Sequence, residues 1–153
     1  MIRKEIKLLD ELAKYTDEVY AKFNAGLIPT IDQTRILGVR IPVLRQIAKN
    51  KAKELEAVGF LEDLPHQYHE EDLLHGIIVS NLQDFNQCVK EIDDFLPYID
   101  NWAVCDTLSP KVLAKNRKKL LEKIKGWIDA DAPYTVRFAI SMLMQFFSGR
   151  GFL

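Results

Sequence analysis

The chain has 153 residues, of which 48 % are hydrophobic and 28 % charged, with a formal net charge of −1. This composition is typical of a soluble globular protein and excludes disorder throughout the chain. No apolar run approaches the roughly 18 residues of a membrane span, the first residues do not form a signal peptide, and two cysteines without a CxxC pair exclude a disulfide framework. We therefore expect a cytoplasmic protein without a membrane partner.

The charge is distributed unevenly along the chain. Residues 1–50 carry a charge of +3, residues 51–106 a charge of −10, and residues 107–153 a charge of +6. A protein with this pattern can present a positive face although its net charge is close to zero. The distribution permits a polyanionic partner without establishing one.

Helical periodicity dominates the first third of the sequence. Apolar residues recur at helical spacing over residues 6–23, and Gly26 is a plausible end for this long helix. Asp32 is a candidate cap for a short helical turn over residues 33–37. A second long helix begins at Pro42, because proline is favoured in the first turn.

The rest of the chain continues in helical segments. Ser109 and Pro110 form one start signal and Pro133 forms another, and hairpin dipeptides are absent. We expect helices at residues 70–82, 84–96, 109–127 (one or two helices) and 133–147. The predicted fold class is all-α, with consecutive antiparallel helix pairs in a single domain over residues 1–153. A HEAT-like solenoid and a closed helical bundle both fit this pattern.

Trp102 and Asp106 are the first candidate site residues. They are four positions apart, so on a helix they share one face. An aromatic plane beside a carboxylate can support a cationic or oxocarbenium-like sugar. The structural alternative is a core tryptophan followed by an aspartate near a helix end.

Arg137 is the second candidate, because it lies within the apolar segment YTVRFAI. A guanidinium in such surroundings needs an anion as its partner. That anion is either an internal carboxylate, such as that of Asp106, or a phosphate group of a ligand.

A lysine-rich run is the third feature. Residues 111–125 contain seven cations and one acid, Glu122. A solvated helix face explains such a run, and so does contact with the DNA backbone without base specificity. Arg40 and Arg45 flank the helix start at Pro42, where a phosphate can bind. The candidate DNA-binding residues are therefore Arg40, Arg45, Lys111, Lys115, Lys118 and Lys119.

Three histidines, His66, His69 and His75, are candidate metal ligands. Their spacing matches no zinc template, and the acids at positions 70–72 are interpreted as surface residues. The sequence also contains no phosphate-binding loop, dinucleotide fingerprint or serine nucleophile elbow. We expect neither a metal nor an organic cofactor.

Three segments together are similar to a known family. They are residues 27–45, which contain LIPT and LGVRIPVLR, residues 100–106 (DNWAVCD) and residues 134–140 (YTVRFAI). This set resembles the bacterial DNA alkylation repair proteins of the AlkD type, which are HEAT-like solenoid DNA glycosylases, and it covers nearly the whole chain. The resemblance implies hydrolysis of the N-glycosidic bond of alkylated purines, notably 7-methylguanine and 3-methyladenine, without metal or cofactor.

The resemblance also implies roles for individual residues. The catalytic tryptophan, aspartate and arginine of the family match Trp102, Asp106 and Arg137, and its concave positive face binds double-stranded DNA. An alkylated purine is a cationic leaving group, so the sugar cation is what a carboxylate must stabilise. The alternatives are a non-catalytic helical-repeat DNA-binding protein and a protein-interaction solenoid.

The C-terminal end departs from the family pattern. Family members continue for several more helices, one of which supplies a second tryptophan that Trp127 does not match. We therefore expect a shortened C-terminus and doubtful activity. An uncovered last helix, with Leu143, Met144 and Phe147 exposed, is then expected to favour a homo-oligomer.

Overall fold

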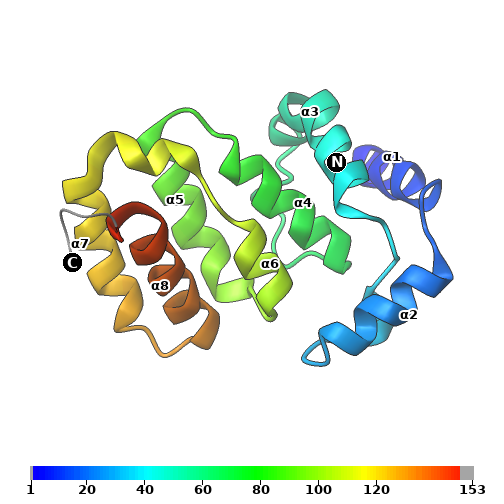
Figure 1. The fold of residues 1–153 in the computed structure, drawn as a ribbon. Helices are drawn as coiled ribbons and strands as arrows, with labels where there is room; N and C mark the ends of the chain where they lie inside the picture. Colours follow the sequence, from blue (N-terminus) through cyan, green and yellow to red (C-terminus); the bar gives the residue numbers. More distant parts are fainter. Residues whose placement is uncertain (1, 149–153) are drawn as a thin grey trace. The chain divides into compact units, whose positions relative to one another are not determined.

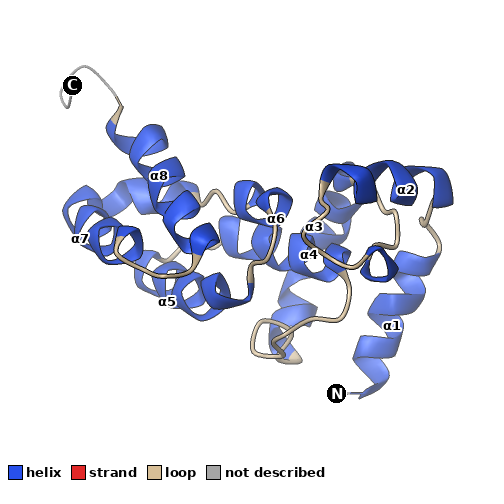
Figure 2. Cartoon of the chain, turned by 90° about the horizontal axis from the view of Figure 1, so that it is seen from below, coloured by secondary structure: helices blue, strands red, loops and turns tan. Residues whose placement is uncertain are grey.

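The computed structural model describes residues 2–148, with side chains from Lys7 onward, and this part contains helices and no strand (Figures 1 and 2). The predicted all-α class is confirmed. The chain divides into two compact units, Met1–Ile78 and Val79–Leu153. In the described part of the chain, none of the helices has both the length and the apolar character required to span a bilayer.

The first unit is built around buried aliphatic side chains from several elements, among them Leu12, Ile28, Leu44 and Leu74. Its helices are α1 (Ile2–Ala13), α2 (Glu18–Leu27), the 3-10 helix η1 (Gln33–Arg35), α3 (Ile41–Ala57) and most of α4 (His69–Ser80).

The single long helix predicted over residues 6–23 is wrong, because the chain breaks between α1 and α2. Asp17 caps α2 by accepting hydrogen bonds from the amides of Val19 and Tyr20 at 3.0 and 3.1 Å, and a local cap of this kind starts a new helix. The apolar stripe does not remain buried either, since Val19 is 80 % and Phe23 64 % exposed. The side chain of Ile6, which belongs to the predicted stripe, lies outside the described residues.

The other start signals in this half of the chain behave as predicted. The side chain of Asp32 caps η1 by accepting from the Thr34 amide at 2.8 Å. Pro42 lies in the first turn of α3. The helix predicted to end near position 82 ends at Ser80.

The second unit contains the remaining helices. They are α5 (Phe85–Phe95), the 3-10 helix η2 (Leu96–Tyr98), α6 (Trp102–Thr107), the 3-10 helix η3 (Lys111–Asn116), α7 (Arg117–Ile128) and α8 (Pro133–Phe147). The cap predicted at Ser109 is wrong, because its hydroxyl bonds to the Gln145 side chain at 2.9 Å and Pro110 precedes η3. Asn116 instead caps α7 through the Lys119 amide.

Helices α7 and α8 lie side by side in both views (Figures 1 and 2). Trp127 of α7 meets Phe138 of α8 edge to face, with ring centroids 5.2 Å apart. On the last turns of α8, Phe147 is buried and Leu143 half-buried, while Met144 is 65 % exposed. The prediction of three exposed apolar residues is therefore wrong for Phe147, which turns into the unit, and holds in full only for Met144.

Candidate active site on helices α6 and α8

Helix α6 presents Trp102 and Asp106 on one exposed face. Asn101 begins the helix by accepting a hydrogen bond from the Val104 amide at 3.0 Å, and Val104 and Cys105 are buried on the opposite face. The four-residue spacing then leaves Trp102 41 % exposed and the Asp106 side chain 40 % exposed. The tryptophan is thus a surface residue and not a core residue.

Arg137 of α8 and Asp106 of α6 form a bidentate ion pair. The Nε and Nη2 groups of Arg137 donate to Oδ1 and Oδ2 of Asp106 at 2.9 and 2.8 Å. The arginine side chain is 48 % exposed, because Phe138 and Ala139 carry the buried face of α8 at this turn. The hydrogen bond to Asp106 raises the pKa of Arg137 above its ordinary value. The two candidates are therefore brought together at the surface.

An open depression of about 570 Å³ adjoins this ion pair. Three of its lining residues, Asp106, Arg137 and Ser141, are polar, and the other four are apolar. Its lining residues are Asp106, Pro133, Val136, Arg137, Ile140, Ser141 and Met144. Trp102 is not part of this lining, so it borders the carboxylate only along the face of α6.

The chemistry available at this site rests on the carboxylate and not on the neighbouring thiol. Cys105 is buried, and burial together with the charge of Asp106 raises the pKa of its thiol to about 12. Its Sγ donates to the Tyr134 carbonyl oxygen at 3.3 Å. A thiol that is protonated and already donates a hydrogen bond is a poor nucleophile. An exposed carboxylate of fixed orientation can instead face a positive charge that develops on a bound substrate.

The lysines of the candidate DNA-binding set are all exposed, but they fall into two groups. Lys111 and Lys115 line a second depression of about 270 Å³, and the Lys115 ammonium donates to the Gln83 carbonyl at 3.0 Å. Lys118 and Lys119 lie in the first turn of α7, where no described acid pairs with them. Both ammonium groups are therefore available to a polyanion.

Two other cations of the same run are structural. The Lys123 ammonium donates to Asp93 at 2.6 Å and lies over the Trp127 ring, 5.7 Å from its centroid. The Arg117 guanidinium donates to the Phe146 carbonyl. Neither of the two interpretations of the run, a solvated face or a DNA contact, describes these two cations, because both are bound within the protein.

Arg40 and Arg45 belong to the first unit. The Arg40 guanidinium pairs with Asp17 at 3.1 Å and lies over the Tyr20 ring, 4.6 Å from its centroid. Arg45 is exposed on α3. Arg40 is thus already engaged with the start of α2, whereas the Arg45 side chain points to solvent.

A family model described as "DNA alkylation repair enzyme" matches residues 8–150. The chain belongs to this family. Neither the search of curated proteins nor the search of solved structures gives a match. The matched range includes the ion pair and all three segments of the sequence resemblance. Membership of this DNA alkylation repair family points to DNA as the substrate and to an enzyme as the role, and the all-helical structure agrees with the helical-repeat fold of such proteins.

A buried glutamate of this family member was missed in the sequence. Glu70 was interpreted as a surface acid, but it is fully buried and accepts hydrogen bonds from the amides of Leu37, Gly38 and Val39 at 2.9, 2.9 and 3.2 Å. The same correction applies to Asp72, which is buried and pairs with Arg35. The only signal was that LGVR supplies consecutive amides near a glycine, and such a run needs an acceptor.

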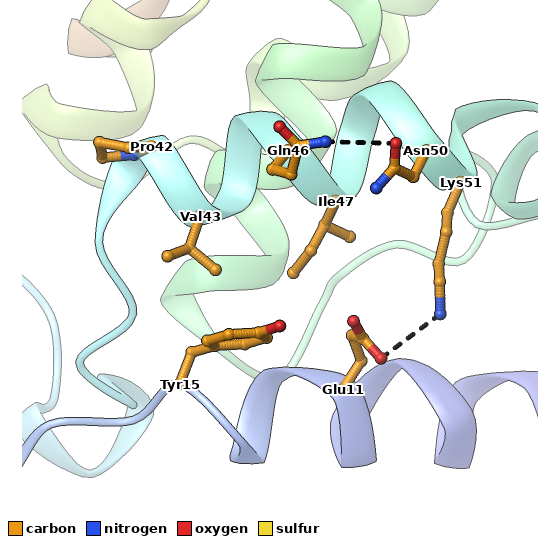
Figure 3. Close-up of a pocket in the computed structure, with 8 residues that line it drawn as sticks. All are labelled: Glu11, Tyr15, Pro42, Val43, Gln46, Ile47, Asn50 and Lys51. Atoms are coloured by element: carbon orange, nitrogen blue, oxygen red, sulfur yellow. Dashed lines mark hydrogen bonds and ion pairs between the residues drawn. The ribbon is translucent and has the colours of Figure 1, made fainter.

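A groove of about 280 Å³ lies between α1 and α3, with the Tyr15 ring opposite Val43 and Ile47 (Figure 3). Its polar end is occupied, because Lys51 pairs with Glu11 at 3.5 Å, and Gln46 bonds to Asn50 on its rim. None of the predicted site residues lines this groove. It therefore offers an apolar surface without a free acid or base.

Two of the three histidines, His66 and His75, form a buried pair. His66 Nε2 and His75 Nδ1 are 2.9 Å apart, and the His66 ring stacks on Phe60. Burial lowers the pKa of His66 to about 4 and that of His75 to about 3. In the described part of the chain, no group of three or more potential ligands is placed to hold a metal ion.

Proposed function

We propose that the protein is a DNA glycosylase of the AlkD type. It hydrolyses the N-glycosidic bond of alkylated purines, such as 7-methylguanine and 3-methyladenine, in double-stranded DNA. The observation that carries the proposal is the exposed Asp106 carboxylate, which lies on the same face of α6 as Trp102. Two hydrogen bonds from Arg137 of α8 fix the orientation of this carboxylate.

The chemistry follows from the charge of the substrate. An alkylated purine is already cationic and leaves without protonation. The species of high free energy that the enzyme must stabilise is therefore the sugar cation. Asp106 stabilises this cation or orients the attacking water, and Trp102 packs against the deoxyribose. Asp106 uses two of the five N–H donors of Arg137, which leaves donors for a flanking phosphate. Neither a metal nor an organic cofactor takes part.

The exposed lysines supply the affinity for the duplex in this proposal. Lys118 and Lys119 contact phosphates, and the depression beside Lys111 and Lys115 receives another. Contacts of this kind position the protein without reading the sequence. Substrate selection then falls to the site on α6 and α8.

The decisive experiment is a base-release assay on a methylated duplex, with wild type compared with Asp106→Asn. The variant keeps the shape of the side chain and removes its charge, so the rate should fall by about 10²–10³. The affinity for duplex and the melting temperature should change little. Asp129→Asn, an exposed aspartate of the same unit, is the matched control.

Two outcomes would contradict the proposal. Equal rates in wild type and Asp106→Asn would remove the carboxylate from the chemistry. Salt-dependent binding to the duplex without any base release by wild type would favour the second candidate, a non-catalytic helical-repeat DNA-binding protein, for which the exposed Lys118 and Lys119 already suffice.

A further inference from the structure

Helix α6, which carries Asp106, is too short to hold its own position. It has six residues, and isolated helices shorter than roughly 12 residues are at best marginally stable in water. The cap from Asn101 acts within the helix, at its N-terminal end. The C-terminal end, where Asp106 lies, therefore depends on bonds to other elements.

Ser80 supplies such bonds at the C-terminal end of α6. It is the last residue of α4 and belongs to the second unit, as α6 does. Its hydroxyl donates to the Thr107 carbonyl oxygen at 3.3 Å and accepts from the Ser109 amide at 2.9 Å. Since Thr107 directly follows Asp106, this one side chain holds the backbone that carries the carboxylate.

The segment that Ser80 holds is also bonded to α8. The hydroxyl of Ser109 donates to the Gln145 side chain at 2.9 Å. On the same helix, Arg137 donates to both carboxylate oxygens of Asp106. The position of this segment along α8 thus decides whether both oxygens meet the guanidinium.

The bidentate bond tolerates little displacement. Its two N···O distances are 2.9 and 2.8 Å, and hydrogen bonds weaken steeply when they lengthen or bend. In enzymes, a misplacement of about 1 Å can lower the rate by about 10²-fold. Loss of the Ser80 hydroxyl removes an anchor next to Asp106, so the end of α6 gains freedom to move.

A contribution to stability alone does not account for this hydroxyl. Ser80 is half-buried and lines the open depression beside Lys111, so water can reach the groups that it binds. Water can replace a lost hydrogen bond at small cost in free energy, but it does not hold two backbone groups in one place. Removal of the hydroxyl should therefore affect the geometry of Asp106 more than the stability of the unit.

We infer that Ser80 is a positioning residue for Asp106: its hydroxyl fixes the end of α6, so that both carboxylate oxygens meet the Arg137 guanidinium. Ser80 itself contacts neither the substrate nor the reacting atoms. The kinetic consequence rests on the proposed function, since it assumes that Asp106 acts in base release. The geometric consequence does not depend on that function.

The kinetic test compares Ser80→Ala with Ser80→Thr. Ser80→Ala should lower kcat for base release by about tenfold and leave the affinity for the methylated duplex within about twofold, because the cations on the surface are unchanged. Ser80→Thr retains the hydroxyl, and its methyl group can enter the open depression. This variant should remain within about threefold of the wild-type kcat.

NMR tests the geometry without any activity. The Nε–H proton of Arg137 donates to Oδ1 of Asp106, so it should exchange slowly with water in wild type and faster in Ser80→Ala. Its resonance is assigned by its absence in Arg137→Lys. The control is Ile124→Val, which removes a buried methyl group from α7 of the same unit and none of these bonds. It should keep the wild-type kcat and exchange rate.

Several results would overturn the inference. They are an unchanged kcat or an unchanged proton exchange in Ser80→Ala, a Ser80→Thr variant as slow as Ser80→Ala, and an equal loss of kcat in Ile124→Val. Loss of the folded state in Ser80→Ala, seen by circular dichroism, would assign the hydroxyl to stability. If wild type releases no base, the glycosylase proposal fails by itself, and the exchange of the Arg137 proton alone decides the role of Ser80.

Discussion

Arg137 holds both carboxylate oxygens of Asp106 at hydrogen-bond distance, while each side chain remains at least 40 % exposed. An ion pair in such contact with water contributes only about 0–1 kcal/mol to the free energy of unfolding. Its two parallel bonds nevertheless fix the plane of the carboxylate. The pair is therefore better suited to orientation than to stability.

Arg137→Lys should separate these two roles. Lysine retains the charge but cannot form the bidentate fork, so base release should fall by about tenfold or more. The free energy of unfolding, measured with urea, should change by less than about 1 kcal/mol. A variant that loses stability and activity in parallel would show that the pair is mainly structural.

Gly38→Ala tests the loop that precedes α3. Gly38 has a φ of +88°, and a Cβ atom there would lie 2.3 Å from the Asp17 carbonyl oxygen. The substitution should cost about 1–3 kcal/mol. Gly126→Ala in α7 is the matched control, because a Cβ there meets nothing within 4 Å and should stabilise the helix by about 0.5–1 kcal/mol. Equal denaturation midpoints for the two variants would contradict the steric argument.

The sequence predicted features that depend on residues close together in the chain and missed contacts between residues far apart in the chain. Local signals were sufficient for the cap at Asp32 and for the starts at Pro42 and Pro133, because each acts within a few residues. The shared face of Trp102 and Asp106 likewise follows from helix geometry alone.

Long-range contacts were beyond these signals. Asp106 and Arg137 are 31 residues apart in the sequence. The sequence therefore could not decide whether the partner of the arginine is a carboxylate or a phosphate. The burial of Glu70 depends on a loop more than thirty residues away. The exposure of Val19 and Phe23 was missed because periodicity marks an apolar face but not whether anything covers it.

Lys118→Ala/Lys119→Ala should weaken duplex binding at low salt. Each phosphate contact that is lost should reduce the slope of log affinity against log salt by about 0.9. Lys123→Ala is the control, since its ammonium is held by Asp93 and should contribute to stability more than to DNA binding. Fluorescence anisotropy over a salt series measures the affinity and its salt dependence for both variants. A larger loss of affinity with Lys123→Ala than with Lys118→Ala/Lys119→Ala would refute the assignment of Lys118 and Lys119, and not Lys123, to DNA binding.

Glu70→Gln should destabilise the first unit although it removes no bulk. One carboxylate oxygen accepts from Gly38 and Val39 and the other from Leu37, so an amide nitrogen would have to face a backbone N–H group. Loss of charge-assisted bonds in a buried site should cost about 2–3 kcal/mol. Glu62→Gln, at an exposed glutamate, should remain within about 0.5 kcal/mol of wild type in urea unfolding.

The buried pair of His66 and His75 should make the protein sensitive to acid. Burial lowers the pKa of the two rings to about 4 and about 3, against an ordinary value of 6.5 in an unfolded chain. Between these values the unfolded state binds more protons than the folded state. The free energy of unfolding is therefore highest above pH 6.5 and falls as the pH is lowered towards 4.

Urea unfolding between pH 7.5 and 4.5 measures this loss, which should reach about 1.4 kcal/mol per pH unit for each histidine. Glu71 acts in the opposite direction, because burial raises the pKa of its carboxyl group in the folded state, so it offsets part of the slope at the acidic end. The double variant His66→Phe/His75→Leu lacks both titrating rings and should show a flatter profile. Ring resonances of wild type followed by NMR provide a second measurement that needs no variant. A pair that titrates near pH 6.5 in the folded protein would remove the physical basis of the prediction, because the folded and unfolded states would then bind the same number of protons at each pH.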